Sequence, residues 1–144
     1  QAIGQRERLP DVARDAVEVL EHATRDNDGM RLLVALSYGG REELVAAARA
    51  LADDVAAGRL LPQQVDEAAL SGRLTTAGLP DPELLVRTSG ELRVSNFLLW
   101  QIAYAELVVS PKLWPDFEAA DLDTAIAEFH ARDRRFGGVR GDPA

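Results

Sequence analysis

Short apolar runs of strand length alternate along this chain with longer segments in which apolar residues recur every three or four positions. The runs are 30–37, 84–86 and 106–110. A continuous apolar run of this length suits a strand that is buried on both faces of a parallel sheet. The alternation therefore predicts an α/β fold, with a mostly parallel sheet flanked by helices.

Five of the intervening segments are predicted to be helical. The first begins at Pro10, a good first helical residue, and Asn27-Asp28-Gly29 stops it. The second begins near Arg41, and Gly58 stands where the residue after a helix C-cap belongs. Ser95 is the expected N-cap of a short fourth helix. The five segments are 10–26, 41–57, 63–70, 96–103 and a last one through 122–129.

Composition limits the chemistry and the partners of the chain. The 144 residues include no cysteine, which excludes thiol nucleophiles, redox pairs and Cys-based zinc sites and fits a reducing compartment. With 16 basic against 24 acidic side chains, the net charge of −8 argues against a general nucleic-acid binder. The most apolar run, 97–109, is too short to span a bilayer. We therefore expect one ordinary globular domain without a transmembrane segment.

The densest chemical signal lies between Arg87 and Asn96. Arg87 leaves a predicted strand at its C-terminal end, where parallel sheets bind ligands, and Arg93 and Ser95 follow within eight residues. Two guanidinium groups, a hydroxyl and a helix N-terminus suit a phosphate or a diphosphate. The alternative is structural, because arginines at strand ends often pair with carboxylates and Glu91 is close in sequence. The spacing leaves both interpretations open.

Glu106 is an acidic residue inside an apolar passage, 103–109, where a carboxylate is costly unless it is paired or bound to a metal. A Mg²⁺ ion that bridges this carboxylate to a diphosphate would remove the cost, because magnesium takes few protein carboxylates and fills its other positions with phosphate oxygens and water. A buried ion pair with Arg87 or Arg93 would do the same. The sequence pattern alone does not choose between them.

These residues belong to a longer block that resembles one protein family. The block, DPELLVRTSGELRVSNFLLWQIAYAELVVSPKLWPDF at 81–117, closely resembles the C-terminal signature of the cis-prenyltransferases, which include undecaprenyl and decaprenyl diphosphate synthases. Further matches are Tyr38-Gly39-Gly40-Arg41, the opening Ile3-Gly4 and the closing Arg135-Phe136-Gly137-Gly138. The resemblance therefore covers essentially the whole chain.

The resemblance implies an enzyme that condenses isopentenyl diphosphate with an allylic diphosphate, makes a Z double bond and uses Mg²⁺. Arg87, Arg93 and Ser95 match the residues that hold the head group of isopentenyl diphosphate, and Glu106 matches a carboxylate that helps to bind Mg²⁺. Gly137 matches a tail that crosses to the partner subunit and completes its diphosphate site. We therefore expect a cytoplasmic homodimer that binds no nucleic acid and touches membranes only peripherally, through its lipid product.

Part of the family pattern is absent from the chain. The Asp-Gly-Asn motif, which supplies the catalytic Asp and belongs to the N-terminal half of the family, does not occur. Leu92 stands where some members carry His, and Ser37 stands where Asn is usual. The chain, which opens at Gln1 without a Met, is therefore interpreted as the C-terminal part, residues 1–144, of a single catalytic domain. We expect it to be inactive alone.

An alternative interpretation comes from another class of function. A non-catalytic partner subunit of a two-component cis-prenyltransferase would also donate the C-terminal tail. Intact Arg87, Arg93, Ser95 and Glu106 favour the enzyme, because a supporting subunit does not need a complete head-group site. The sequence does not determine the length of the product, the allylic substrate or the choice between regular and branched condensation.

Overall fold

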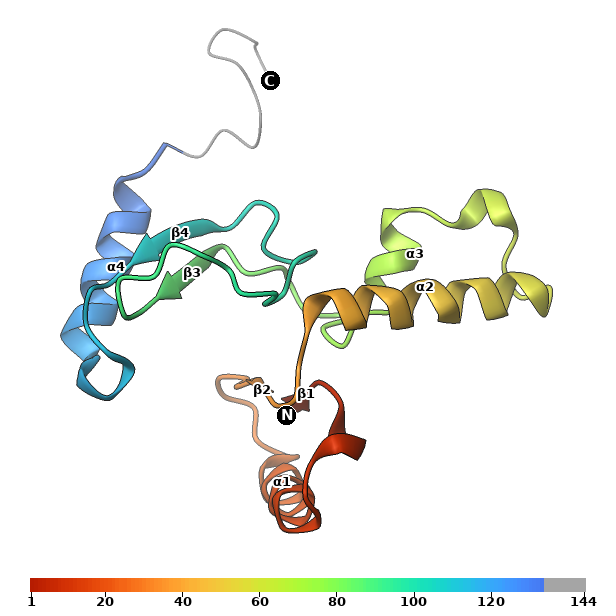
Figure 1. Ribbon diagram of the computed structural model, residues 1–144, viewed down its shortest axis with the longest axis horizontal. Coiled ribbons are helices and arrows are strands. Elements are labelled where there is room, and N and C mark those ends of the chain that lie inside the picture. Colours follow the sequence, from red (N-terminus) through yellow and green to blue (C-terminus); the bar gives the residue numbers. More distant parts are fainter. Residues whose placement is uncertain (134–144) are drawn as a thin grey trace, which may run out of the picture. The chain divides into compact units, whose positions relative to one another are not determined.

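The computed structural model describes residues 1–133, which form two compact units, one of residues 1–79 and one from Pro80 onward. Each unit combines one pair of parallel strands with helices (Figure 1), which confirms the predicted α/β class. The first unit contains β1 (Ala2–Ile3), α1 (Asp11–Thr24), β2 (Val34–Ala35), α2 (Gly40–Ala56) and α3 (Glu67–Ser71). The second contains β3 (Leu84–Arg87), β4 (Glu106–Val109) and α4 (Ala119–Ala131).

The strand pair of the first unit depends on a glycine. A Cβ atom on Gly4 would lie 2.2 Å from the carbonyl oxygen of Leu36, and Gly4 has a φ of +109°. Only glycine tolerates both conditions. The backbone N–H of Gln5 then donates to the carbonyl of Ser37 at 3.2 Å. The end of β1 is thus held against the chain that leads into the Tyr-Gly-Gly-Arg segment, 38–41.

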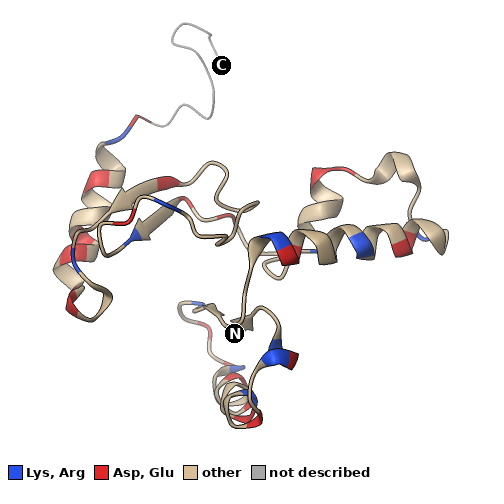
Figure 2. Ribbon diagram, viewed as in Figure 1, with Lys and Arg blue, Asp and Glu red and all other residues tan. Residues whose placement is uncertain are grey.

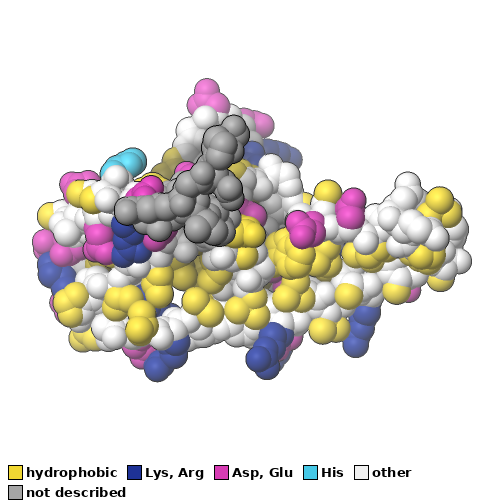
Figure 3. Space-filling model, turned by 90° about the horizontal axis from the view of Figure 1, so that it is seen from above, with side chains coloured by type: hydrophobic (Ala, Val, Ile, Leu, Met, Phe, Trp, Pro, Cys, Tyr) yellow, Lys and Arg dark blue, Asp and Glu magenta, His cyan; other side chains and the backbone are white. Residues whose placement is uncertain are grey.

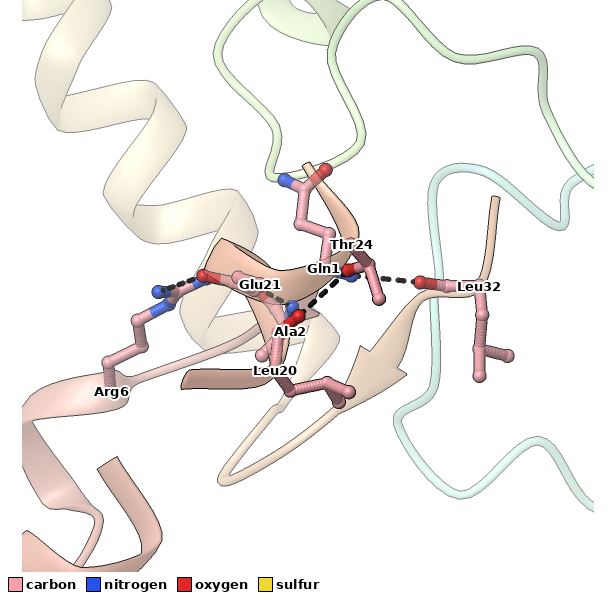
Figure 4. A network of polar contacts seen from close by, with 7 residues as sticks. All are labelled: Gln1, Ala2, Arg6, Leu20, Glu21, Thr24 and Leu32. Atoms are coloured by element: carbon pink, nitrogen blue, oxygen red, sulfur yellow. Dashed lines mark hydrogen bonds and ion pairs between the residues drawn. The ribbon is translucent and has the colours of Figure 1, made fainter. Parts of the chain in front are cut away.

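Polar contacts attach α1 to β1 (Figure 4). The carboxylate of Glu21 accepts hydrogen bonds from the backbone N–H of Ala2 at 2.7 Å and from both terminal nitrogens of Arg6, at 2.9 Å and 2.5 Å. The Arg6 guanidinium and, second, the Ala2 N–H hold the pKa of Glu21 below its ordinary value. No residue of α1 is buried. The helix is therefore held to its unit by these contacts more than by packing.

The second predicted helix is α2, and its end follows the predicted geometry. Gly58 has a φ of +72°, and its N–H donates to the carbonyl of Val55 at 3.0 Å, as expected of a glycine that follows a helix. Ala47 and Leu51 are buried on one face of this helix. Basic and acidic residues are interspersed along α1 and α2, where Figure 2 colours the ribbon blue and red.

Two buried carboxylates on α2 hold the chain that follows it. The carboxylate of Glu43 accepts from the backbone N–H of Thr75 at 2.8 Å and also from the Thr75 hydroxyl. That of Asp54 accepts from Nε of Arg59 at 2.7 Å and pairs with Arg73. Because a buried carboxylate needs partners, these contacts fix the segment after α2 against the helix.

The strands of the second unit run parallel, with Leu84 opposite Glu106 and Arg87 opposite Val109. Helix α4 packs against both strands, and Ala125 of this helix is buried. Glu106 is therefore the first residue of its strand, while Arg87 is the last residue of its own. At about 3.3 Å per residue, three residues separate their positions by roughly 10 Å along the pair.

The predicted helix at 96–103 is wrong, because turns occupy this segment. Ser95, Asn96 and Leu98 have φ values of +48°, +62° and +44°. A right-handed helix needs φ near −63°, so these residues cannot begin one. Ser95 is consequently not an N-cap, and no helix N-terminus adds its dipole to the site that the sequence predicts here.

The predicted helix at 63–70 is interrupted. A short 3₁₀ turn occupies Pro62–Gln64, and α3 begins only at Glu67. The side chain of Asp66 caps α3 by accepting from the backbone N–H of Ala69 at 2.8 Å. The sequence pattern missed the break because the apolar spacing continues through it.

The prediction that the strands are buried on both faces is also wrong for the described chain. Met30 and Leu32, within the first apolar run, are 92% and 63% exposed, and only Val34–Ala35 of that run form a strand. All four residues of β3 are half-buried. A strand is buried on both faces only where other elements pack against both faces of its sheet. Figure 3 shows hydrophobic side chains among charged ones on the face in view.

Candidate functional site

Glu91 brings the two predicted anion-binding arginines together. One oxygen of its carboxylate accepts from Nη2 of Arg87, and the other accepts from Nη2 of Arg93. The side chains of Arg87 and Glu91 are each 32% exposed, whereas that of Arg93 is 65% exposed. The structural alternative raised by the sequence, pairing with Glu91, is therefore present. It does not exclude an anion site, because each guanidinium engages Glu91 through one nitrogen only.

The loop that carries Glu91 is fixed by backbone contacts. Ser89 and Gly90 both have positive φ, +67° and +66°. The N–H of Ser89 donates to the carbonyl of Lys112 at 2.7 Å, and that of Gly90 donates to the carbonyl of Ser110 at 2.8 Å. The loop is thus attached to the segment after β4, which sets the position of Glu91 at the C-terminal end of β3.

Ser95 lies at the same place. Nη2 of Arg87 is 3.4 Å from the hydroxyl oxygen of Ser95. Nε of Arg87 is buried and has no hydrogen-bond partner among the described residues. A buried donor without an acceptor costs about 1–3 kcal/mol. An anion at this position would supply the missing acceptor.

Hydrogen bonds determine the ionisation of Glu91, and therefore the net charge of the cluster of Arg87, Glu91 and Arg93. The hydrogen bond from Arg87, followed by the attraction of both guanidinium groups, holds the pKa of Glu91 below its ordinary value. Glu91 is therefore ionised at neutral pH, and the cluster of two arginines and one glutamate carries one net positive charge. That charge favours an anionic ligand.

Glu106 does not join this cluster. It begins β4, three positions along the strand pair from Arg87, and its Oε2 atom accepts from Nη1 of Arg132 at 2.9 Å. Arg132, which follows α4, also donates to Glu128, and Glu106 and then Glu128 raise its pKa above the ordinary value. The alternative that the sequence left open, an ion pair of Glu106 with Arg87 or Arg93, is therefore wrong. Its partner is Arg132, 26 residues away in the sequence.

The sequence also predicted a role for Gly137, a metal site and the lack of a transmembrane segment, and the structure describes only part of the chain for each. Gly137 lies outside residues 1–133. Among those residues, no group of three or more His, Cys, Asp or Glu side chains is placed to hold a metal ion. No helix within the same range has the length and apolar content needed to cross a bilayer.

Sequence reasoning missed the role of Arg132. Nothing in the local sequence links this residue to Glu106. The available signal was the cost of an unpaired carboxylate in an apolar passage, which requires a partner but does not identify it. Only the packing of α4 against β4 does so.

Most of the sequence also matches known proteins. Residues 1–137 match a prenyltransferase family described as "Putative undecaprenyl diphosphate synthase". The isoprenyl transferase of Brucella abortus biovar 1 is 51% identical over 137 residues, which are 95% of this chain and 54% of that protein. The Xanthomonas axonopodis pv. citri protein named ditrans,polycis-undecaprenyl-diphosphate synthase ((2E,6E)-farnesyl-diphosphate specific) is 51% identical over 135 residues, which are 94% and 52% of the two chains.

The fold matches as well. The crystal structure of lavandulyl diphosphate synthase from Lavandula x intermedia, in complex with dimethylallyl diphosphate, superimposes with a TM-score of 0.93 at 44% identity. The match covers 96% of this chain and 59% of that one. The chain spans about half the length of the curated relatives that it matches. Sequence and fold together show that this chain belongs to the undecaprenyl diphosphate synthase family of prenyltransferases.

Proposed function

We propose that the chain is the part of a cis-prenyltransferase that binds isopentenyl diphosphate, and that the whole enzyme condenses this substrate with an allylic prenyl diphosphate to form a Z polyprenyl diphosphate. The names of the relatives, isoprenyl transferase and undecaprenyl diphosphate synthase, support the class of reaction. The observation that carries the proposal is the convergence of Arg87, Arg93 and Ser95 around Glu91.

Arg87, Arg93 and Ser95 would hold the diphosphate head group. Guanidinium groups bind phosphate oxygens through paired N–H donors, and the Ser95 hydroxyl adds a single donor. The buried Nε of Arg87, which lacks an acceptor among the described residues, suits such a contact. A head group fixed at this end of β3 would keep the isopentenyl double bond in one place, which lowers the entropic barrier to reaction with a second substrate.

Mg²⁺ is part of the proposal, with Glu106 as its protein ligand. The donor chemistry fits a single carboxylate contact, since Arg132 engages only Oε2 of Glu106. The described residues do not form a site of protein ligands alone, because no three or more His, Cys, Asp or Glu side chains among them are grouped to hold a metal ion. Magnesium commonly takes one or two carboxylates and completes its shell with phosphate oxygens and water. When bound, the ion would neutralise part of the charge of a diphosphate at this end of β4, which lies roughly 10 Å along the strand pair from Arg87.

The domain proposal rests on uncovered apolar surface. An open groove of about 930 Å³ lies between α1 and the chain around β2, and its lining includes Leu20, Met30 and Leu32. These three side chains are between 57% and 92% exposed. Apolar surface of this kind supports the interpretation that residues 1–144 are the C-terminal part of a larger catalytic domain, which covers β2 and α1.

The proposal also includes a cytoplasmic homodimer. Gly137 of one subunit would complete the diphosphate site of the other, and contact with membranes would be peripheral and made through the lipid product. The net charge of −8 supports the absence of nucleic acid among the partners.

Turnover of the complete gene product tests the function. It is incubated with Mg²⁺, labelled isopentenyl diphosphate and either geranyl or farnesyl diphosphate, and the products are separated by length and examined by NMR. We expect longer prenyl diphosphates whose new double bonds are Z. The chain of residues 1–144 alone serves as the control and should give none. New double bonds in the E configuration, or turnover by the pure control chain, would contradict the proposal.

A further inference from the structure

We propose that Glu91 is a positioning residue of the head-group site, whose carboxylate holds Arg87 and Arg93 as an aligned pair for the diphosphate. This inference rests on the proposed function and adds to it a residue that does not itself bind the substrate. The alternative role for the same carboxylate is that of an internal competitor, which the diphosphate would have to displace.

The hydrogen-bond geometry favours alignment over competition. Glu91 divides its two oxygens between the arginines, so each guanidinium is engaged through Nη2 and keeps its other nitrogens. In Arg87 the remaining Nε is buried without a partner among residues 1–133. A carboxylate that merely filled the anion site would be expected to use this donor as well.

Backbone hydrogen bonds hold the loop at Glu91 in place, whereas the guanidinium group of Arg93 is largely exposed. The two positive-φ residues that precede it, Ser89 and Gly90, donate to the carbonyls of Lys112 and Ser110. Arg93, by contrast, is 65% exposed and has Glu91 as its ion-pair partner. Because a free arginine loses much rotamer entropy when it binds a ligand, a fixed carboxylate that orders it in advance favours binding.

The charge of the cluster supports the same role. Glu91 reduces the repulsion between two guanidinium groups that lie close together, yet it leaves one net positive charge for the ligand. Without the carboxylate, the two groups would repel each other and separate. A diphosphate would then have to bring them together itself.

The test compares Glu91→Gln with Glu91→Asp in the complete gene product. Glutamine keeps the shape but loses the charge, so the dissociation constant for isopentenyl diphosphate should rise roughly tenfold or more. Aspartate keeps the charge on a shorter side chain and should restore part of the affinity. The dissociation constant for inorganic diphosphate should change in the same order, rising more in Glu91→Gln than in Glu91→Asp. The kcat at saturating isopentenyl diphosphate, the KM of the allylic substrate and the melting temperature should change little.

A matched control removes an equal charge elsewhere. Asp11 pairs with Arg14 at 3.1 Å and is 88% exposed, so Asp11→Asn should leave both dissociation constants unchanged. Tighter binding of diphosphate by Glu91→Gln would identify a competitor and overturn the inference. Unchanged diphosphate binding by Glu91→Gln would also overturn the inference. So would a lowered melting temperature of this variant together with equal losses of affinity for both substrates.

Arg93→Ala, measured in parallel, separates this inference from the proposed function. If Arg93→Ala weakens isopentenyl diphosphate binding and Glu91→Gln does not, only the positioning role fails. If neither variant alters binding, the head-group site itself is wrongly assigned and the positioning role fails with it.

Discussion

Nη1 of Arg132 donates to Oε2 of Glu106 at 2.9 Å, which connects the end of α4 to the first residue of β4. The contact places Glu106 away from the cluster that Glu91 organises at the other end of the strand pair. The proposed magnesium ligand and the proposed head-group arginines are therefore separate features of the second unit. They can be tested separately.

Glu106→Gln should raise the Mg²⁺ concentration needed for half-maximal activity and lower turnover, because an amide is a much poorer magnesium ligand than a carboxylate. Arg132→Gln is the matched control, since it breaks the same ion pair and leaves the carboxylate in place. Both variants should lower the melting temperature, but only the first should shift the magnesium titration. Equal melting shifts with two unchanged magnesium titrations would assign Glu106 a purely structural role.

The stability of the first unit should depend on pH through Glu21. Arg6, and then the Ala2 N–H, lower the pKa of this carboxyl in the folded chain. The charged form therefore stabilises the fold above the unfolded pKa of about 4.3, and the contribution is lost as pH falls through the lowered folded value. Urea midpoints measured from about pH 7 to about pH 3 should decline, and Glu21→Gln should reduce that decline. An equal slope in the variant would contradict the assignment.

Thr75→Val should destabilise the fold by about 1–3 kcal/mol, because it removes a hydroxyl donor from the buried carboxylate of Glu43. Thr24→Val is the control. The Thr24 hydroxyl donates to a helix carbonyl in an exposed position, so its loss should cost within about 0.5 kcal/mol. Denaturant unfolding of both variants measures the difference, and equal losses would show that Glu43 does not depend on Thr75.

Removal of the tail from Arg135 onward should leave folding and dimerisation intact and reduce activity, if the tail serves the partner subunit. A mixture of this deletion variant with an Arg87→Ala, Arg93→Ala variant should recover part of the activity. The recovery arises because a heterodimer pairs one intact head-group site with an intact tail. Native mass spectrometry establishes that the subunits exchange. With exchange shown, a mixture no more active than its parents would exclude action in trans.

Local patterns predicted most of the fold. The helical periods at 10–26, 41–57 and 122–129 correspond to α1, α2 and α4, and the apolar runs at 84–86 and 106–110 correspond to β3 and β4. These features depend on spacing within one element, which the sequence displays directly. Strand burial depends on what packs against each face of the sheet, so the same runs could not reveal how exposed β2 and β3 are.

The structure brings the predicted head-group residues together, but it lacks the helix N-terminus that the sequence predicted beside them. Arg87, Arg93 and Ser95 do gather, since Arg87 ends β3 and the loop that follows it carries the other two. The expected helix N-terminus failed because Ser95 and Asn96 have positive φ values, which the apolar spacing of the segment does not reveal. The Arg132 partner of Glu106 could not be found from sequence, because the contact joins two elements that are far apart along the chain.

Equilibrium binding of isopentenyl diphosphate to Arg93→Ala in the complete gene product tests most directly whether Arg93 helps to hold the diphosphate of this substrate. Loss of a charge-assisted contact should weaken binding by about 1.5–3 kcal/mol, or roughly ten- to a hundred-fold. Binding of the allylic substrate should change much less. An unchanged dissociation constant for isopentenyl diphosphate, in a variant that melts like the parent, would show that Arg93 does not hold the diphosphate.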